Sequence, residues 1–137
     1  MLTTTITPRV SETDGAGHIN NTFVPVWFEA GRLEIFRALT PDLSFGGWRV
    51  ALVNMNVDYR AQLYFGVDCQ IETWIEHVGN KSFKVGERVL QRGQVCAEGT
   101  CVYVYFDIEA QQSLVIPDKE RAWLESHLPS GPTTIDQ

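Results

Sequence analysis

The order of apolar and polar residues divides the first third of the chain into a strand, a loop and a helix. Residues 3–10 are rich in β-branched side chains and predict a strand. Residues 11–21 hold two glycines, an aspartate and two asparagines, which is typical of a loop. Residues 23–39 then have helical spacing and end just before a Thr-Pro pair.

The predicted helix at residues 23–39 is apolar nearly all the way round. Asn21 or Thr22 can cap its start and Pro25 fits its first turn, so a helix of about four to five turns is expected. A helix without a polar face is normally covered on all sides. We therefore expect the rest of the fold to bury it.

From residue 51 the period changes to two for more than fifty residues, which indicates strands. Four are expected, at residues 51–59, 68–76, 81–91 and 94–106. Arg92-Gly93 predicts a hairpin between the last two strands, and Pro117 predicts the start of a short helix that ends near residue 128. In the first of these strands, the residues expected to share the apolar face are Ala51, Val53, Met55, Val57 and Tyr59.

These elements predict an α+β fold in which one antiparallel sheet wraps around one long central helix. The expected domain covers residues 1–128, and residues 129–137 are expected to form a flexible tail. Residues 101–106 are apolar on both faces of their strand, which is more than one helix can cover. We therefore expect a second copy of the chain to cover the outer face, in a homodimer or a homotetramer.

Length and charge exclude several classes of protein. The chain has 137 residues, enough for one domain, and its net charge of −6 argues against a nucleic-acid partner. It has no apolar run long enough for a membrane span and no export signal, so a cytoplasmic protein without a membrane partner is expected. The three cysteines lack disulfide or zinc spacing, and neither a metal nor a cofactor is expected.

The residues best suited to chemistry lie in the loop that leads into the helix. Asp14 stands beside Gly15 and Gly17, where a carboxylate can approach a bound carbonyl closely. The free backbone amides at the helix start, at Asn21, Thr22 and Phe23, can stabilise an oxyanion. This pairing suits acyl transfer, with Asp14 as nucleophile or general base. The alternative is that Asp14 only caps a turn.

The segment from Thr13 to Asn21 reads Thr-Asp-Gly-Ala-Gly-His-Ile-Asn-Asn, and a helical Glu-Ala-Gly-Arg follows at residues 29–32. Together they resemble the signature of hotdog-fold acyl-CoA thioesterases of the 4-hydroxybenzoyl-CoA thioesterase family. The resemblance implies a hotdog fold and hydrolysis of an acyl-CoA to free acid and CoA, in which CoA is part of the substrate. It also implies that Asp14 is the catalytic carboxylate and that His18 shapes the loop. Gln62 stands where the family usually has proline, and Val67 where it has aspartate, which questions the shape of that turn.

Other residues are assigned by their position or charge. Glu34 is a second candidate acid, because its helical angle places it near Phe23 and Trp27. Glu29 and Arg32 are expected to pair with each other or to cap strand edges. Cations expected to bind the CoA phosphates, with a neighbouring serine, are Arg60, Lys81, Ser82, Lys84 and Arg88. Residues expected to border the acyl pocket are Phe23, Trp27 and Phe45.

Two alternatives to a thioesterase remain. The same pocket could hold an acyl thioester without cleaving it. A hotdog hydratase acting on enoyl thioesters is the other, although the predicted helix contains no histidine of the kind that such enzymes carry.

Overall fold

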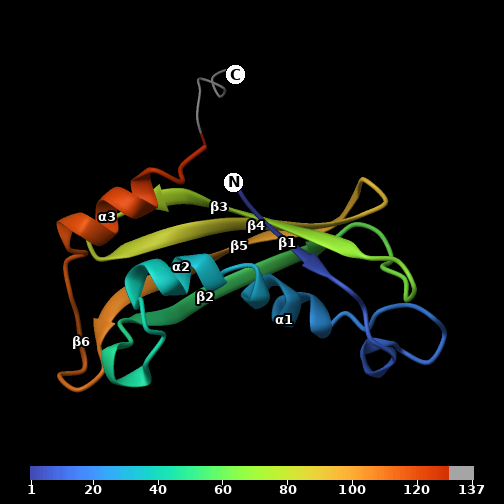
Figure 1. The fold of residues 1–137 in the computed structure, drawn as a ribbon, viewed down its shortest axis with the longest axis horizontal. Helices are drawn as coiled ribbons and strands as arrows, with labels where there is room; N and C mark the ends of the chain where they lie inside the picture. Colours follow the sequence, from blue (N-terminus) through green and yellow to red (C-terminus); the bar gives the residue numbers. More distant parts are fainter. Residues whose placement is uncertain (130–137) are drawn as a thin grey trace.

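The computed structural model describes residues 1–129. Its main sheet is antiparallel with the strand order β1-β3-β4-β5-β2, and β6 pairs with the end of β5. Figure 1 shows α1 and α2 following one another along one face of this curled sheet, while α3 lies at the end where β3 finishes. The strands are β1 (Leu2–Ile6), β2 (Val50–Tyr59), β3 (Cys69–Val78), β4 (Ser82–Gln91), β5 (Gln94–Asp107) and β6 (Gln112–Ser113). The helices are α1 (Phe23–Ala30), α2 (Leu33–Leu39) and α3 (Asp118–Glu125).

The predicted α+β plan and the four successive strands are confirmed, with small changes at their ends. The hairpin at Arg92-Gly93 joins β4 to β5, and both residues have positive φ. The first strand ends at Ile6 rather than at residue 10, because the chain turns into a short 3₁₀ turn at Val10–Glu12. Most of the tail expected at residues 129–137 lies outside the described residues.

The prediction of one continuous central helix is wrong. α1 ends at Ala30 and α2 begins at Leu33, because two residues between them are fixed by the sheet. A Cβ at Gly31 would lie 2.6 Å from Ile71 Cγ2, so the backbone packs directly on β3. Arg32 donates to the Glu87 carboxylate at 2.7 and 2.9 Å and to the Tyr103 hydroxyl at 3.1 Å. Arg32 therefore pairs with Glu87 and not with Glu29.

The predicted apolar face of β2 is right for one half of the strand and wrong for the other. A β-bulge between Leu52 and Asn54 shifts the register against β5, so that Leu52 pairs with Tyr103 and Met55 with Cys101. Val53 is 58% exposed as a result. An extra residue in one strand reverses the side-chain alternation beyond it, which a strict period of two does not anticipate.

The core forms two clusters, one under each helix. The cluster under α2 is closed by α3 and includes Ile35, Phe83 and Tyr103. The cluster under α1 includes Phe28 and Ile71. The sheet thus buries both helices as expected, and it holds the start of α1 against the loop that carries Asp14. Within residues 1–129 no helix is both long and apolar enough to cross a bilayer.

Candidate active site

The loop before α1 folds back on itself and holds Asp14 at its turn. Thr13 forms a backbone bridge with Ile19, and the Asp14 amide donates to the His18 carbonyl at 2.9 Å. Gly15 and Gly17 both have φ near 90°, a conformation that side chains disfavour. The turn therefore depends on the glycines on either side of Ala16.

The Asp14 carboxylate is held in its charged form, and its side chain is 40% exposed. Its Oδ1 accepts a hydrogen bond from the Ala16 amide at 2.8 Å, and His18 Nδ1 lies 3.7 Å from Oδ2. The Ala16 amide, and then the neighbouring His18, hold the pKa of Asp14 below its ordinary value. Asp14 is thus ionised at neutral pH, as a nucleophile or base requires.

His18 is fixed on the other side by a short segment that follows β2. Its backbone bridges to Tyr64, and the two rings meet edge to face with centroids 5.1 Å apart. The Gln91 side chain, which is buried, anchors this segment by accepting from the Tyr64 amide and donating to the Tyr64 carbonyl. The role of His18 in shaping the loop stays a prediction.

Two of the three backbone amides expected to be free at the start of α1 already donate hydrogen bonds within the protein. The Thr22 amide donates to the Asn20 side chain at 3.0 Å, and the Phe23 amide donates to the Asn20 carbonyl at 3.0 Å. Within the described residues the Asn21 amide has no such acceptor. The Tyr59 hydroxyl donates to the Asn21 carbonyl at 2.9 Å, which ties the end of β2 to this turn. Of the three amides, that of Asn21 is therefore the one without a protein acceptor in the part of the chain that the structure describes.

Two hollows lie near these elements. The larger, about 720 Å³, is an apolar groove along α1 and α2. We call it the α1–α2 groove; it is lined by Val26, Glu29, Ala30, Leu33, Phe36, Phe45, Trp48, Val50, Leu52 and Tyr103. The smaller, about 310 Å³, lies at the start of α1 and is lined by Asn21, Tyr59, Arg60, Ala61 and Gln62. Asp14 lines neither hollow in the single chain.

Of the three residues expected to border the acyl pocket, Phe23 and Trp27 lie in the cluster under α1, apart from Phe45. Phe45 lines the α1–α2 groove and is 86% exposed. Trp27 is buried, and its indole Nε1 donates to Glu12 at 3.0 Å. Phe23 packs against the cluster under α1. The groove residues that the sequence did not reveal, such as Leu33 and Leu52, come from segments whose proximity depends on the whole sheet.

Glu34 lies on the outside of α2. Its side chain is 57% exposed and forms an ion pair of 2.7 Å with Arg37. The helical angle that placed it beside Phe23 and Trp27 assumed one uninterrupted helix. Because the helix breaks at Gly31, that angle is wrong. Glu34 instead points outward and pairs with Arg37.

The five residues expected to bind CoA do not form one cluster. Arg60 lines the hollow beside Asn21 and pairs with Glu98. Arg88 is on β4, the strand that also carries Lys84, and it pairs with Glu72 on β3. Lys81, Ser82 and Lys84 are at the start of β4, the opposite end of that strand from Gln91.

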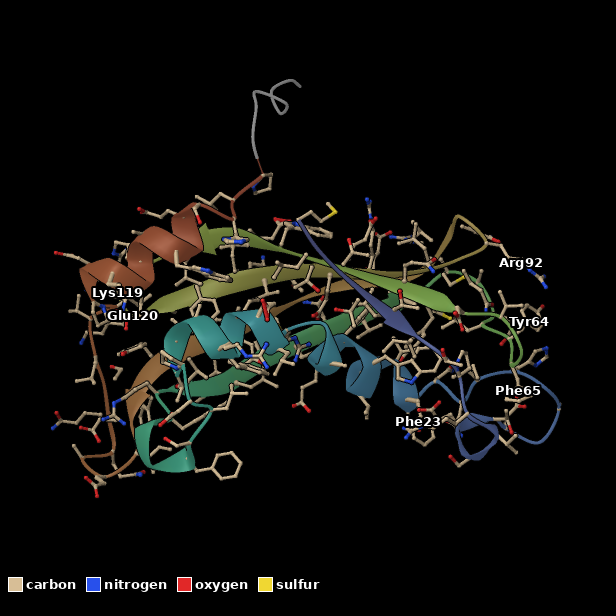
Figure 2. The ribbon with its side chains drawn as sticks, viewed as in Figure 1. Phe23, Tyr64, Phe65, Arg92, Lys119 and Glu120 are labelled. Atoms are coloured by element: carbon tan, nitrogen blue, oxygen red, sulfur yellow. The ribbon has the colours of Figure 1, made fainter. Side chains whose placement is uncertain are left out.

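A further cation, Arg92, lies in the hairpin between β4 and β5. Figure 2 shows Arg92, Tyr64 and Phe65 at the same end of the molecule as Phe23, whereas Lys119 and Glu120 are at the other end. Tyr64 and Phe65 are each 45% exposed. Their proximity depends on the β4–β5 hairpin reaching past the segment after β2, which no local pattern reveals. Across residues 1–129, no three His, Cys, Asp or Glu side chains are grouped to hold a metal ion.

A family model described as the thioesterase-like superfamily matches residues 8–124. The chain belongs to this superfamily. It is 29% identical over 129 residues to the 1,4-dihydroxy-2-naphthoyl-CoA hydrolase of Synechococcus sp. (strain CC9605), covering 88% of this chain and 87% of the relative. Its structure is similar to that of a predicted thioesterase from Bacillus stearothermophilus, with a TM-score of 0.92 and 53% identity, covering 95% of this chain and 98% of the other.

A thioesterase from Thermus thermophilus, complexed with coenzyme A and Zn, shares the fold with a TM-score of 0.82 at 22% identity, covering 91% and 92% of the two chains. Membership of the thioesterase-like superfamily confirms the expected hotdog arrangement of a curled antiparallel sheet around central helices. It also confirms the expected class of enzyme, a thioester hydrolase of the acyl-CoA thioesterase type. The residues that carry out the reaction have to be argued from the site.

Proposed function

We propose that this thioesterase hydrolyses an acyl-CoA with the Asp14 carboxylate as its nucleophile. The carboxylate attacks the thioester carbonyl carbon, the C–S bond breaks, and the CoA thiolate leaves and takes up a proton. Water then hydrolyses the acyl–Asp14 anhydride, which frees the carboxylic acid and restores the carboxylate. The observation that carries this proposal is the Asp14 carboxylate held in its charged form by the Ala16 amide, in the loop that leads into α1.

The lowered pKa of Asp14 supports the nucleophile over a general base. A general base works best when its pKa lies near the operating pH, and Asp14 lies further from neutrality than an ordinary aspartate. A nucleophilic carboxylate only has to be ionised. Thiolate is a good leaving group, since cysteine-like thiols have a pKa of about 8.5, so no strong general acid is required. The Asn21 amide, at the positive end of α1, is the proposed oxyanion donor.

A second copy of the chain completes the site in this proposal. β2 pairs with β5 on one side, and its other edge is free within the described sheet. This edge is ten residues long, and Leu52 and Val53 are 48% and 58% exposed. A long apolar strand edge invites pairing with another strand. We propose a homodimer in which the two β2 strands pair antiparallel across a two-fold axis.

Antiparallel pairing of β2 would bring the α1–α2 groove to the Asp14 loop of the other copy. In such a pair the Val50 end of one strand meets the Tyr59 end of the other. Val50 and Leu52 line the groove, while Tyr59 is bonded to Asn21 at the start of α1. The acyl group would then lie in the groove of one copy and its carbonyl at Asp14 of the other. This arrangement accounts for the absence of Asp14 from the groove of a single chain.

The groove supports an apolar or aromatic acyl group as the substrate. Its walls include Phe36, Phe45, Trp48 and Tyr103, and about 720 Å³ accommodates a one- or two-ring acyl group. The relative from Synechococcus is named for a two-ring substrate, and such an ester belongs in the test panel. We keep Arg60 as the proposed ligand of the CoA phosphates, because it is the one of the five expected residues that lines the hollow beside Asn21.

The proposal is tested by following release of CoA from a panel of short, long and aromatic acyl-CoA esters. Asp14→Asn should lower turnover about 10²- to 10⁴-fold, the range typical of a catalytic carboxylate, while folding stays intact. Asp42→Asn is the matched control, because Asp42 also accepts a backbone amide two residues on, at 3.0 Å. Equal turnover of Asp14→Asn and Asp42→Asn would contradict the proposal. Tight ester binding by the unchanged chain without CoA release would favour the non-catalytic alternative.

A further inference from the structure

Glu12 is a buried carboxylate that the reaction described above does not use. Its side chain is 2% exposed, and it accepts three hydrogen bonds. Oε1 accepts the Arg9 amide at 2.7 Å, and Oε2 accepts Arg9 Nη2 at 3.0 Å and Trp27 Nε1 at 3.0 Å. In addition, the Glu12 carbonyl accepts the Asn20 amide at 2.8 Å. One residue thus contacts both ends of the loop and the middle of α1.

These contacts connect the Asp14 loop to the helix that supplies the oxyanion donor. Glu12 and Asn20 form the base of the loop, and Asp14 lies two residues beyond Glu12. The hydrogen bonds that Asp14 itself makes, to Ala16 and His18, stay inside the loop and do not fix its distance from α1. Trp27 is buried in the cluster under α1, so its indole N–H is a rigid point of attachment.

A carboxylate is required at this position, because all three side-chain partners are N–H donors. Only an ionised carboxyl offers acceptors on both oxygens and no donor of its own. Burial by itself raises the pKa of Glu12, but the hydrogen bonds from Arg9 and Trp27 outweigh it and hold the pKa below its ordinary value. The charge is therefore present wherever the protein is folded near neutral pH.

We propose that Glu12 is a positioning residue that sets the distance between the Asp14 carboxylate and the start of α1. The inference rests on the proposed role of Asp14. Displacing a reacting group by about 1 Å can lower turnover about a hundredfold without weakening substrate binding. Glu12→Gln presents an amide NH₂ to donors and should therefore loosen the loop. We expect kcat to fall about ten- to a hundredfold, with KM changed less than about threefold.

Glu87→Gln is the matched control. Glu87 is also a fully buried carboxylate that accepts N–H donors, from Arg32, and it makes no hydrogen bond to the loop. Both variants remove one buried charge, and both are assayed well below their unfolding temperatures. A merely structural role for Glu12 predicts that the two variants lose kcat equally. A positioning role predicts that only Glu12→Gln does.

Trp27→Phe supplies a second variant if Glu12→Gln does not fold. It removes the N–H donor of α1 but leaves the Arg9–Glu12 pair, and a smaller loss of kcat at constant KM is expected. The Trp27 indole N–H signal in a ¹H–¹⁵N spectrum should move in Glu12→Gln and stay in place in Glu87→Gln. Unchanged kcat in Glu12→Gln or, failing that, in Trp27→Phe overturns the inference. Full turnover by Asp14→Asn would instead overturn the proposed role of Asp14.

Discussion

Asp14 combines exposure with a stabilised charge, and this sets the acid limit of the enzyme. A carboxyl whose pKa is lowered stays ionised above that pKa and loses its charge only as the pH falls through it. We therefore expect log(kcat/KM) to stay level down to the ordinary aspartate value of about 3.9 and to decline only below it. Steady-state assays between pH 3 and 8, with folding checked by circular dichroism, measure this profile. A decline of log(kcat/KM) centred above pH 5 would contradict this expectation.

Single residues were predictable where local chemistry decides their role. The turn that holds Asp14 follows from two glycines and an aspartate within four residues, and His18 lies on the same turn. Spacing did not reveal that Trp27 is buried against Glu12 and does not line the α1–α2 groove, because Glu12 is fifteen residues away in sequence. Local periodicity in a sequence cannot reveal a hydrogen bond between side chains fifteen residues apart.

Among the elements, β2 packs against β5 at Gly99 with no room for a side chain. A Cβ there would lie 2.0 Å from the Asn56 carbonyl oxygen, and backbone cannot move aside as a flexible side chain can. Gly99→Ala should therefore lower the free energy of unfolding by at least about 1–3 kcal/mol, the usual cost of overpacking. Urea unfolding measures the change. Gly46→Ala is the control, since nothing lies within 4 Å of its added Cβ, and an equal effect in both would refute the explanation.

The elements themselves were predictable because period two and helical spacing are strong local signals. Their interruptions were not. The bulge at Val53 and the helix break at Gly31 arise from contacts with β5 and β3, segments that are remote in sequence. The misplacement of Glu34 follows directly from the undetected break, because every helical angle beyond it shifts.

At the scale of the whole molecule, a site shared by two copies makes complementation possible. Asp14→Asn removes the carboxylate, and Leu33→Trp fills the α1–α2 groove. If each site takes Asp14 from one copy and the groove from the other, a mixed dimer contains one intact site. Co-refolding equal amounts of two inactive variants should then restore about a quarter of the unchanged activity, from random pairing of copies.

Each variant refolded alone is the control and should stay inactive. A mixture that stays inactive would indicate that one chain holds the whole site. The mass in solution should be that of a dimer or a multiple of it. The apolar pattern of residues 101–106 already suggested a second copy, but only the free edge of β2 indicates where that copy would bind.

The three cysteines have a consequence for work with this enzyme. Cys69, Cys96 and Cys101 are unpaired and buried, and burial raises the pKa of Cys69 and of Cys101 to about 12. Neutral thiols that solvent cannot reach react slowly with disulfides. A colorimetric disulfide reagent should therefore count the coenzyme set free and ignore the catalyst, whose intact mass should remain unchanged after incubation with oxidised coenzyme. An enzyme that makes a thiol at every turnover is in this way spared from exchange with the disulfide to which its product is oxidised.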